Sequence, residues 1–383
     1  MSKTISFVMI GGFLGAGKTT LIARLAHHYS RAGKKIAIVT NDQAFGLVDT
    51  EHLRSEGFSV GEVPGACFCC KFDDLVETAA KLSLEQLPDV LIAEPVGSCT
   101  DLMATVIEPM RQIYGDRFQV GPLTVLVKPE HGEKILSGNG KVGFSPKAAY
   151  IFQKQIEEAN IVAINKIDKL SPERIGHLIE SIDSRFPGKK IIPLSGRSGE
   201  NFDRLVSSIE NPELAKRTFM DVDYDIYASG ESELGWYNCQ ISAEMPAVEG
   251  GNHGDTGRGK FELDRLVLQL IEEIALELRE NRAEPVHLKI LGQSKNMTES
   301  THSAIANLVA SDAAPELSLK SEIWTNSADL IVNARVATDP NTLEKTVKNV
   351  VDRLARRGLV ELSLTGIQAF QPGRPVPIHR MTQ

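Results

Sequence analysis

Short apolar runs alternate with amphipathic stretches along the first ~210 residues of the chain. Several runs are apolar almost throughout, which is typical of strands covered by helices on both faces. The stretches between them have the apolar spacing of helices, for example at 19–28 and 150–158. This alternation predicts an α/β domain with a mostly parallel sheet. Strands are expected at 5–10, 35–40, 89–93, 124–127, 161–165 and 190–194.

From about residue 222 the order of the patterns changes. Two amphipathic helices now separate longer apolar strands, and the second helix can begin at Asp339 and Pro340 and end at Gly358. The resulting β-α-β-β-α-β order predicts a ferredoxin-like α+β domain. Its strands are expected at 234–245, 286–291, about 322–337 and 359–369.

The 383 residues exceed one ordinary compact domain, so two domains are expected. We place the α/β domain at 1–212 and the α+β domain at 222–372, followed by a loose, Pro-rich tail at 373–383. Near the junction, Asp221, Asp223 and Asp225 alternate, which predicts a solvated strand edge.

Composition narrows the class of partner. With 42 basic and 50 acidic side chains, the net charge of −8 argues against nucleic acid or an anionic membrane as main partner. No apolar run approaches the ~20 residues that span a bilayer. We therefore expect a cytoplasmic protein, and in that reducing compartment clustered thiols are more often metal-binding or catalytic than disulfide-bonded.

The segment GFLGAGKTT lies between the first apolar run and a helix, as a phosphate-binding P-loop requires. Its glycines allow backbone N–H groups to surround phosphates at the positive end of the helix. Lys18 can neutralise the β- and γ-phosphates, and the Thr19 hydroxyl can ligate Mg²⁺. The phosphate-binding residues are expected to be Gly15, Ala16, Gly17, Lys18, Thr19 and Thr20.

The segment NKID, at the end of a later strand, predicts the base. The Asp168 carboxylate can accept two hydrogen bonds from guanine N1 and N2, which adenine cannot offer, so it selects GTP over ATP. Asn165 is expected to brace the loop and the Lys166 stem to lie over the base. Ser195, in SGRSG after the next strand, is expected to contact the base through its backbone.

Two acidic residues follow strands that should end beside the phosphates. Asp42 can bind Mg²⁺ through water or orient the attacking water, and Glu94 ends its strand in the Walker B position. Gly97 can turn a backbone N–H towards the γ-phosphate. Lys18, Asp42 and Glu94 are therefore the candidate catalytic residues; the alternative is that both acids only cap strand ends.

Three of the five cysteines, Cys67, Cys69 and Cys70, occupy four positions in GACFCC. In an extended segment Cys67 and Cys69 point the same way, and a kink at Cys70 brings in a third sulfur. Thiolates suit Zn²⁺ or Cu(I) and, with nitrogen or oxygen partners, Co²⁺ and Ni²⁺. Three sulfurs leave an open position on a tetrahedral ion, which suits a metal that is passed on.

Two other interpretations of the cluster are a redox-active pair and core packing. For a metal, the fourth ligand stays open between water, Glu62, Asp73 and a partner's residue. Cys99 follows Gly97 closely and is expected to be a buried thiol rather than a ligand, and Cys239 a core residue.

With the P-loop, C-x-C-C, E-x-x-G and NKxD in this order, the first ~210 residues resemble the CobW-like GTPases, which are grouped with the nickel-insertion GTPases HypB and UreG. The resemblance implies a GTPase domain that delivers or allocates a metal ion. The second half agrees in general form with that family's smaller α+β domain. The chain departs from the usual pattern at Asn41-Asp42-Gln43-Ala44, at Gly65-Ala66 and in a Gly-rich loop with only His253.

Together these features predict a GTP-hydrolysing metallochaperone or cofactor-assembly factor. Its expected ligands are GTP, Mg²⁺ and Zn²⁺ (or Co²⁺ or Ni²⁺), and its expected partner is a client metalloprotein or cofactor enzyme; a homodimer is left open. The rival hypothesis is a nucleotide-gated binding module that remodels a cofactor-dependent client without carrying metal, with structural or redox-sensing cysteines.

Overall fold

The computed structural model describes residues 4–43, 47–136, 145–246, 259–296, 302–308, 313–358 and 360–382. His253 of the Gly-rich loop lies outside these described residues. The chain divides into two compact units. The first comprises Met1–Gln43, Phe58–Glu231 and Gly373–Gln383, and the second comprises Ala44–Gly57 and Ser232–Pro372.

Besides including the expected tail, Gly373–Gln383, in the first unit, the division differs from the expected boundaries in two places. Helix α9 (Tyr224–Glu231) packs against α6 (Pro146–Glu158) and so belongs to the first unit. Helix α2 (Val48–Ser55) packs against strands of the second unit, where the Val48 N–H donates to Asn333 Oδ1 at 2.7 Å. Both differences arise from packing between segments distant in sequence, which apolar spacing does not encode.

The first unit contains a sheet of eight parallel strands in the order β3-β2-β4-β1-β6-β7-β8, with β5 also paired to β1. The six expected strands are present. Strands β3 and β5 were not expected, because β3 mixes polar with apolar residues and β5 has only three residues. The strands are β1 (Ile5–Gly12), β2 (Ile36–Asp42), β3 (Ser59–Pro64), β4 (Val90–Glu94), β5 (Phe118–Val120), β6 (Thr124–Val127), β7 (Ile161–Ile164) and β8 (Lys190–Pro193).

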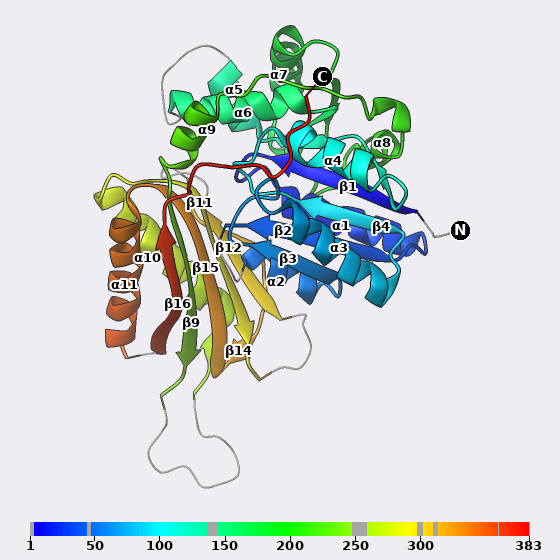
Figure 1. The fold of residues 1–383 in the computed structure, drawn as a ribbon. Helices are drawn as coiled ribbons and strands as arrows, with labels where there is room; N and C mark the ends of the chain where they lie inside the picture. The colour runs from blue at the N-terminus through cyan, green and yellow to red at the C-terminus, as the bar shows by residue number, and fades with distance from the viewer. Residues whose placement is uncertain are drawn as a thin grey trace. The chain divides into compact units, whose positions relative to one another are not determined.

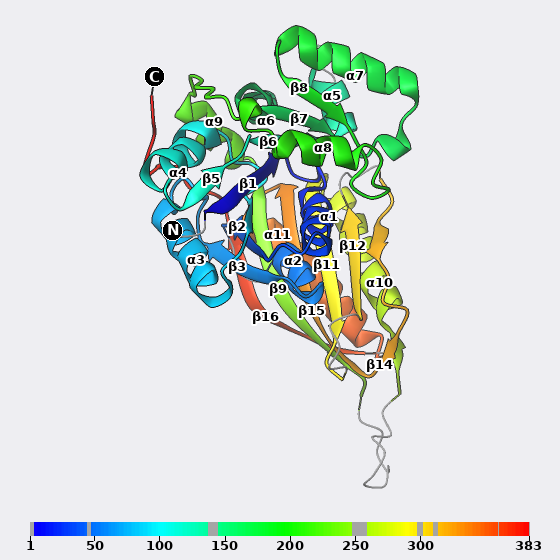
Figure 2. The same ribbon diagram turned by 90° about the vertical axis from the view of Figure 1, so that its right-hand side faces the viewer.

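Helices cover this sheet. Helix α1 packs beside β2 and β4, and helix α3 packs beside β2 and β3. Helices α5, α7 and α8 lie near β7 and β8 (Figures 1 and 2). A π-helical turn, Met103–Ile107, leads into α4. The helices are α1 (Lys18–Arg31), α3 (Phe72–Gln86), α4 (Glu108–Ile113), α5 (Pro129–Leu136), α6, α7 (Pro172–Arg185), α8 (Phe202–Ile209) and α9, with short 3₁₀ turns at η2 (Ile167–Lys169) and η3 (Pro212–Leu214).

The three alternating aspartates do not form a strand edge. Asp223 lies just before α9, and its Oδ1 accepts hydrogen bonds from the backbone N–H groups of Asp225 (2.9 Å) and Ile226 (3.0 Å). This satisfies N–H groups that a first helical turn leaves without partners. The predicted strand edge is therefore wrong, because the aspartate acts as a helix cap.

The second unit contains an antiparallel sheet in the order β13-β12-β11-β15-β9-β16. Its apolar side chains form one core with helices α10 and α11, which also pack against each other (Figure 1). The expected β-α-β-β-α-β order is present as β9 (Gly235–Glu244), α10 (Leu263–Glu280), β11 (Glu284–Ser294), β15 (Ser327–Ala337), α11 (Pro340–Arg356) and β16 (Glu361–Phe370).

Additional strands extend this arrangement. The strands β12 (Ser303–Leu308) and β13 (Glu316–Leu319) widen the sheet beyond β11, and β10 (Phe261–Glu262) pairs with β14 (Trp324–Thr325). The start of α11 is as expected, since Asp339 Oδ1 accepts from the Thr342 N–H at 2.9 Å. Among the residues that the structure describes, no helix has the length and apolar character needed to cross a membrane.

Candidate functional site

The P-loop joins the carboxyl end of β1 to α1. Gly12 and Gly17 have φ values of 132° and 92°, in a region that favours glycine. A Cβ at Gly12 would lie 2.5 Å from Leu126 O, and one at Gly17 would lie 2.6 Å from Asn165 Nδ2. The backbone conformation and the close neighbours therefore both require glycine at these two positions. Because glycine has no side chain, the N–H groups of the loop stay unobstructed there.

Lys18, Thr19 and Glu94 form a buried polar group at the end of this loop. The Lys18 Nζ donates to Gly12 O at 3.1 Å and lies 4.0 Å from Glu94 Oε1. The Thr19 hydroxyl donates to Glu94 Oε1 at 3.2 Å. Thr20 is exposed on the first turn of α1. Strand β4 thus brings the Glu94 carboxylate, the candidate Walker B residue, to Lys18 and Thr19.

Asn165 connects three loops at the carboxyl ends of β1, β7 and β8. Its Nδ2 donates to Ala16 O at 2.8 Å, and its Oδ1 accepts from the N–H groups of Lys166 and Gly196, each at 2.8 Å. Lys166 has φ of 62°, and its Nζ donates to Gly15 O at 2.9 Å. The NKID segment is therefore held directly against the P-loop.

The other residues expected to contact the guanine base lie in the same region. Asp168 is exposed on the η2 turn, and Ser195 is buried with its Oγ accepting from the Ser198 N–H at 3.0 Å. Arg24 of α1, which sequence reasoning missed, donates through Nε to Gly196 O at 2.7 Å. Its sequence signal was weak, because an arginine on an amphipathic helix usually faces solvent.

Asn41, a second residue that sequence reasoning missed, ties the end of β2 to the cysteine loop. Its Nδ2 donates to Val63 O and to Ala66 O, each at 2.7 Å, and its Oδ1 accepts from the Phe68 N–H at 2.8 Å. The next residue, the half-buried Asp42, accepts from the Gly65 N–H through its carbonyl at 3.1 Å. The strand that carries the acidic candidate Asp42 thus also fixes the loop that presents the thiols.

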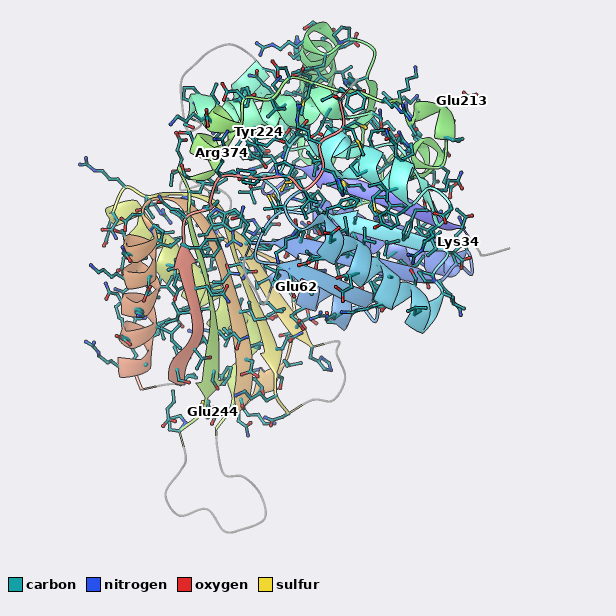
Figure 3. All side chains as sticks on the ribbon, in the orientation of Figure 1. Lys34, Glu62, Glu213, Tyr224, Glu244 and Arg374 are labelled. Atoms are coloured by element: carbon teal, nitrogen blue, oxygen red, sulfur yellow. The ribbon has the colours of Figure 1, made fainter. Side chains whose placement is uncertain are left out.

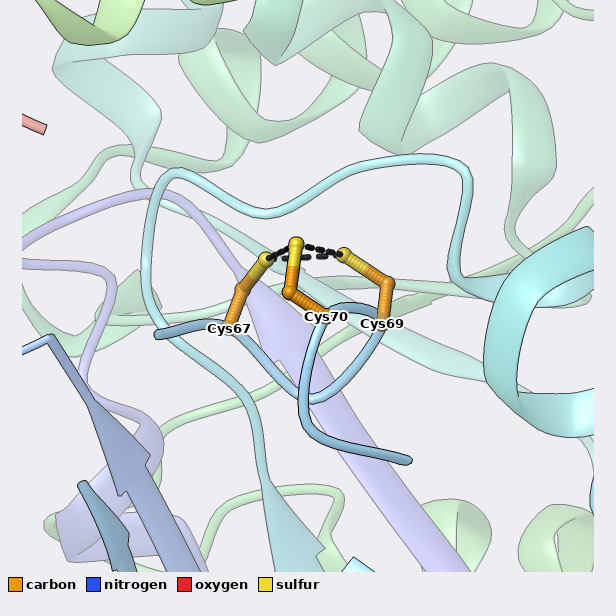
Figure 4. Close-up of side chains that lie close together, drawn as sticks. All are labelled: Cys67, Cys69 and Cys70. Carbon is orange, nitrogen blue, oxygen red and sulfur yellow. Dashed lines mark hydrogen bonds between the residues drawn. The ribbon is translucent and has the colours of Figure 1, made fainter. Parts of the chain in front are cut away.

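Cys67, Cys69 and Cys70 lie on a tight turn between β3 and α3 rather than on an extended segment. The N–H groups of Cys70 and Lys71 both donate to Cys67 O, at 2.9 and 3.0 Å. Cys67 Sγ lies 2.7 Å from Cys69 Sγ and 3.3 Å from Cys70 Sγ, and the last two sulfurs are 3.7 Å apart (Figure 4). The three are free thiols close enough to share one ion, so the turn gathers all three sulfurs without the expected kink.

The thiols of this cluster shift one another's pKa values in opposite directions. Hydrogen bonds from Cys69, Cys70 and Cys99 hold the pKa of the Cys67 thiol well below its usual value, despite burial. The hydrogen bond to Cys67 raises the pKa of Cys69, and burial raises that of Cys99. Neither Glu62 nor Asp73 joins the three sulfurs in one cluster within the described part of the chain.

The E-x-x-G segment after β4 is held by buried side chains of α6. Gln155 Nε2 donates to Gly97 O at 3.0 Å and to Cys99 O at 2.8 Å. Glu158 accepts from the Met103 N–H at 2.9 Å and from the Thr100 hydroxyl at 3.1 Å. A Cβ on Gly97 would lie 2.7 Å from Leu14 Cδ2, so this loop runs against the P-loop.

We expect Glu158 to make stability depend on pH. Burial raises its pKa from 4.5 to about 8, so the folded state holds this proton more tightly than the unfolded state does. The free energy of unfolding should fall as pH rises from 4.5 towards 8 and level off above, by on the order of a few kcal/mol. Urea unfolding of wild type and Glu158→Gln from pH 5 to pH 9 measures this, and the variant should show the smaller decline.

Glu157→Gln is the matched control, because Glu157 is the adjacent carboxylate on α6 and pairs with Lys154 at the surface. It should follow the wild-type pH profile. Identical profiles for wild type and Glu158→Gln would show that Glu158 does not retain its proton in the fold.

The tail, expected to be loose, makes several contacts within the first unit. The N–H of Val376 donates to Cys70 Sγ at 3.1 Å, and that of Ile378 donates to Cys69 O at 2.9 Å. Arg380 Nε lies 2.7 Å from Asp101 Oδ2. Nearby, Arg374 pairs with Asp225, next to Tyr224 on α9, at 2.9 Å (Figure 3). The tail therefore lies against the cysteine turn, and one of its N–H groups can stabilise a thiolate.

Comparisons with known proteins agree with this arrangement. Residues 6–193 match the family model described as "CobW/HypB/UreG, nucleotide-binding domain". The zinc chaperone YeiR of Escherichia coli (strain K12) is 30% identical over 172 residues, which cover 43% of this chain and 47% of that protein. The zinc-regulated GTPase metalloprotein activator 1 of Dictyostelium discoideum is 24% identical over 225 residues, covering 48% and 47%.

This chain thus spans about half the length of these curated relatives. Among solved structures, HypB from Helicobacter pylori in complex with nickel aligns with a TM-score of 0.40 and 18% identity, covering 58% of this chain and 93% of that one. The sequence match rather than this weak structural likeness identifies the domain. The sequence of residues 6–193 is thus similar to the nucleotide-binding domain of the CobW/HypB/UreG family.

Proposed function

We propose that this protein is a GTP-dependent metallochaperone that binds a soft metal ion, with zinc favoured, at Cys67, Cys69 and Cys70. The observation that carries the proposal is the set of hydrogen bonds through which Asn41 connects the end of β2 to the thiol turn. A change at the nucleotide-facing end of β2 would be transmitted to the sulfurs through these bonds. The naming of curated relatives as zinc chaperones supports zinc as the cargo.

The nucleotide chemistry rests on the buried group at the P-loop. When a triphosphate enters, the Lys18 ammonium can exchange its bond to Gly12 O for the phosphate oxygens. Asp168 would read the guanine edge, and Asp42 would orient the attacking water. Much of the barrier reduction would come from positioning and from the charge of Lys18.

The residues present fit Mg²⁺, because Thr19 and Glu94 offer hard oxygen donors 3.2 Å apart at the phosphate end of the loop. Thr19 and, through water, Asp42 or Glu94 would hold the ion. When bound, it would supply charge neutralisation for the phosphates. The hydroxyl of Thr19 must then turn from Glu94, which would free this carboxylate to respond to the nucleotide.

The three cysteines on the turn after β3 suit a soft metal ion as cargo. Three sulfurs on one short turn provide soft ligands and leave one position open, which suits an ion that must be released to a client. Ordering of the β2 and β4 ends by GTP would hold the turn in its metal-binding geometry, and hydrolysis would relax it. The client would be a metalloprotein or cofactor enzyme that accepts the ion.

The test is the zinc affinity of the reduced protein in two nucleotide states. A chromophoric chelator competes for zinc in the presence of Mg²⁺ and either GDP or a non-hydrolysable GTP analogue. We expect tighter binding with the analogue by about 5- to 150-fold, the usual range of coupling between sites. Equally weak binding in both states would instead support the rival function, in which a nucleotide-gated module remodels its client without carrying metal.

A further inference from the structure

The C-terminal tail, residues 373–383, belongs to the first unit and is drawn in red at the C label of Figure 1. Two of its N–H groups bind the cysteine turn. That of Val376 donates to Cys70 Sγ at 3.1 Å, and that of Ile378 donates to Cys69 O at 2.9 Å. Cys70 is half-buried, whereas the other two thiols of the turn are buried. The tail therefore lies against the thiol that solvent reaches most easily.

The sequence of the tail suits this position. Residues 372–378 read PGRPVPI, with proline at 372, 375 and 377. Proline fixes φ and favours an extended conformation in the residue before it, so the tail loses little conformational freedom when it docks. In an extended chain, N–H groups two residues apart point the same way. Because proline has no N–H, the segment 375–378 has donors only at Val376 and Ile378, and both bind the cysteine turn.

A buried carboxylate anchors the end of the tail. Arg380 Nε lies 2.7 Å from Asp101 Oδ2, which also accepts from the Tyr224 hydroxyl at 2.7 Å. The Asp101 side chain is 1% exposed, and Arg380 Nη2 donates to Met220 O at 3.1 Å. Breaking such a pair is costly, because the buried carboxylate loses its charged partner without gaining water. Arg380 thus fixes the tail two residues after Ile378, its last contact with the cysteine turn.

The rest of the tail is held weakly. Arg374 pairs with Asp225 at 2.9 Å, but both side chains are exposed, and exposed ion pairs contribute little. The side chains of Val376 and Ile378 are 70% and 46% exposed, so they leave much of their apolar area in solvent. A segment with few buried apolar contacts opens at a small fraction of the cost of global unfolding. The tail can therefore lift while the first unit stays folded.

We propose that the tail is a removable cover for the thiols, and that reagents and metal acceptors reach Cys70 when the tail lifts from the cysteine turn. Arg380 acts as its latch, because it fixes the tail through Asp101 and Met220 and not through the sulfurs. The shielding concerns the thiols themselves, with or without an ion. Its consequence for metal transfer rests on the proposed function: an ion held by the three sulfurs exchanges slowly while the tail is docked, and a client gains access by displacing the tail.

The rate at which iodoacetamide alkylates Cys70 in the metal-free protein measures how often the tail lifts. Arg380→Ala should raise this rate by roughly 10- to 100-fold, because the tail loses its anchor, and Arg380→Lys, which retains the charge, should raise it less. Mass spectrometry of the alkylated peptides locates the label, and the buried Cys239 of the second unit is the internal reference. Arg356→Ala, which removes an exposed arginine of α11, is the matched control and should leave the rate unchanged.

A double-mutant cycle with Asp101 tests the latch itself. Asp101→Asn should raise the rate as Arg380→Ala does, because either change breaks the same pair. Asparagine tolerates the φ of 65° at this position. The double variant should add little to the single variants. It also leaves no unpaired buried charge, so it decides the question if a single variant folds poorly.

The outcomes separate this inference from the function on which its consequence rests. An unchanged rate at Cys70 in both single variants and the double variant would overturn the inference, and so would a parallel rise at Cys239, which indicates loosening of the whole chain. If the wild type binds no zinc in either nucleotide state, the proposed function fails, while the alkylation rates still decide whether the tail covers the thiols. If zinc binds, its transfer to an excess of chelator should be faster in Arg380→Ala, and an unchanged transfer rate would overturn the role of the cover in metal exchange.

Discussion

Replacing Asp168 with asparagine should reverse the base preference of this protein. The carboxylate can accept two hydrogen bonds from the N1 and N2 groups of guanine, whereas an asparagine amide can accept from N1 but presents an N–H donor to the N2 amino group. The mismatch leaves polar groups unpaired in the complex, so GTP turnover at low concentration should fall by about 10²- to 10⁴-fold. Xanthosine triphosphate offers the complementary edge and should become the better substrate. Steady-state kcat/KM values for both nucleotides measure the reversal.

The residues around Asp168 allow this substitution to test base recognition separately from folding. Asn165 and Lys166, not Asp168, hold the loop against Ala16 and Gly15, so the substitution should leave the fold intact. Asp183→Asn, on the exposed face of α7, is a control of equal charge change and should leave both values unaltered. A variant that retained its preference for GTP would contradict the assignment of the NKID segment to base recognition.

Replacing Cys67, Cys69 and Cys70 together with serine should abolish tight zinc binding. Serine hydroxyls are poor ligands near neutral pH, because they keep the proton that a thiol loses. We expect the dissociation constant to rise by at least about 10³-fold, equivalent to about 4 kcal/mol. Chelator competition under reducing conditions measures it, with the GTP analogue bound.

The same variant should bind GTP normally, since the three thiols belong to the turn after β3 and none belongs to the P-loop or the NKID segment. Cys239→Ser, which removes a buried thiol of the second unit, is the control and should bind zinc as the wild type does. If zinc affinity stayed within a few-fold of wild type, the thiol turn would be a structural or redox element rather than the metal site.

Local patterns predicted the parts of this protein that depend on neighbouring residues. The apolar runs predict six of the parallel strands, and the spacing of Gly12, Gly17 and Lys18 predicts the glycine turn between β1 and α1. The bracing role expected for Asn165 agrees with its three hydrogen bonds. Short or partly polar strands such as β5 and β3 carry too little apolar periodicity to be recognised.

Long-range contacts account for what the sequence pattern did not predict. Asn41 looked like part of an acidic strand end, yet it bonds to residues more than 20 positions later. The tail reaches Cys70 from 306 positions away, a contact for which its prolines gave no signal. Such pairings depend on the packed fold and on no local spacing.

The most direct test of the account is the ratio of wild-type zinc dissociation constants with GDP and with the non-hydrolysable GTP analogue, each with Mg²⁺ and under reducing conditions. Zinc should bind at least about fivefold more tightly with the analogue. A ratio of one would contradict it, because the nucleotide and the thiol turn would then be independent sites in one domain.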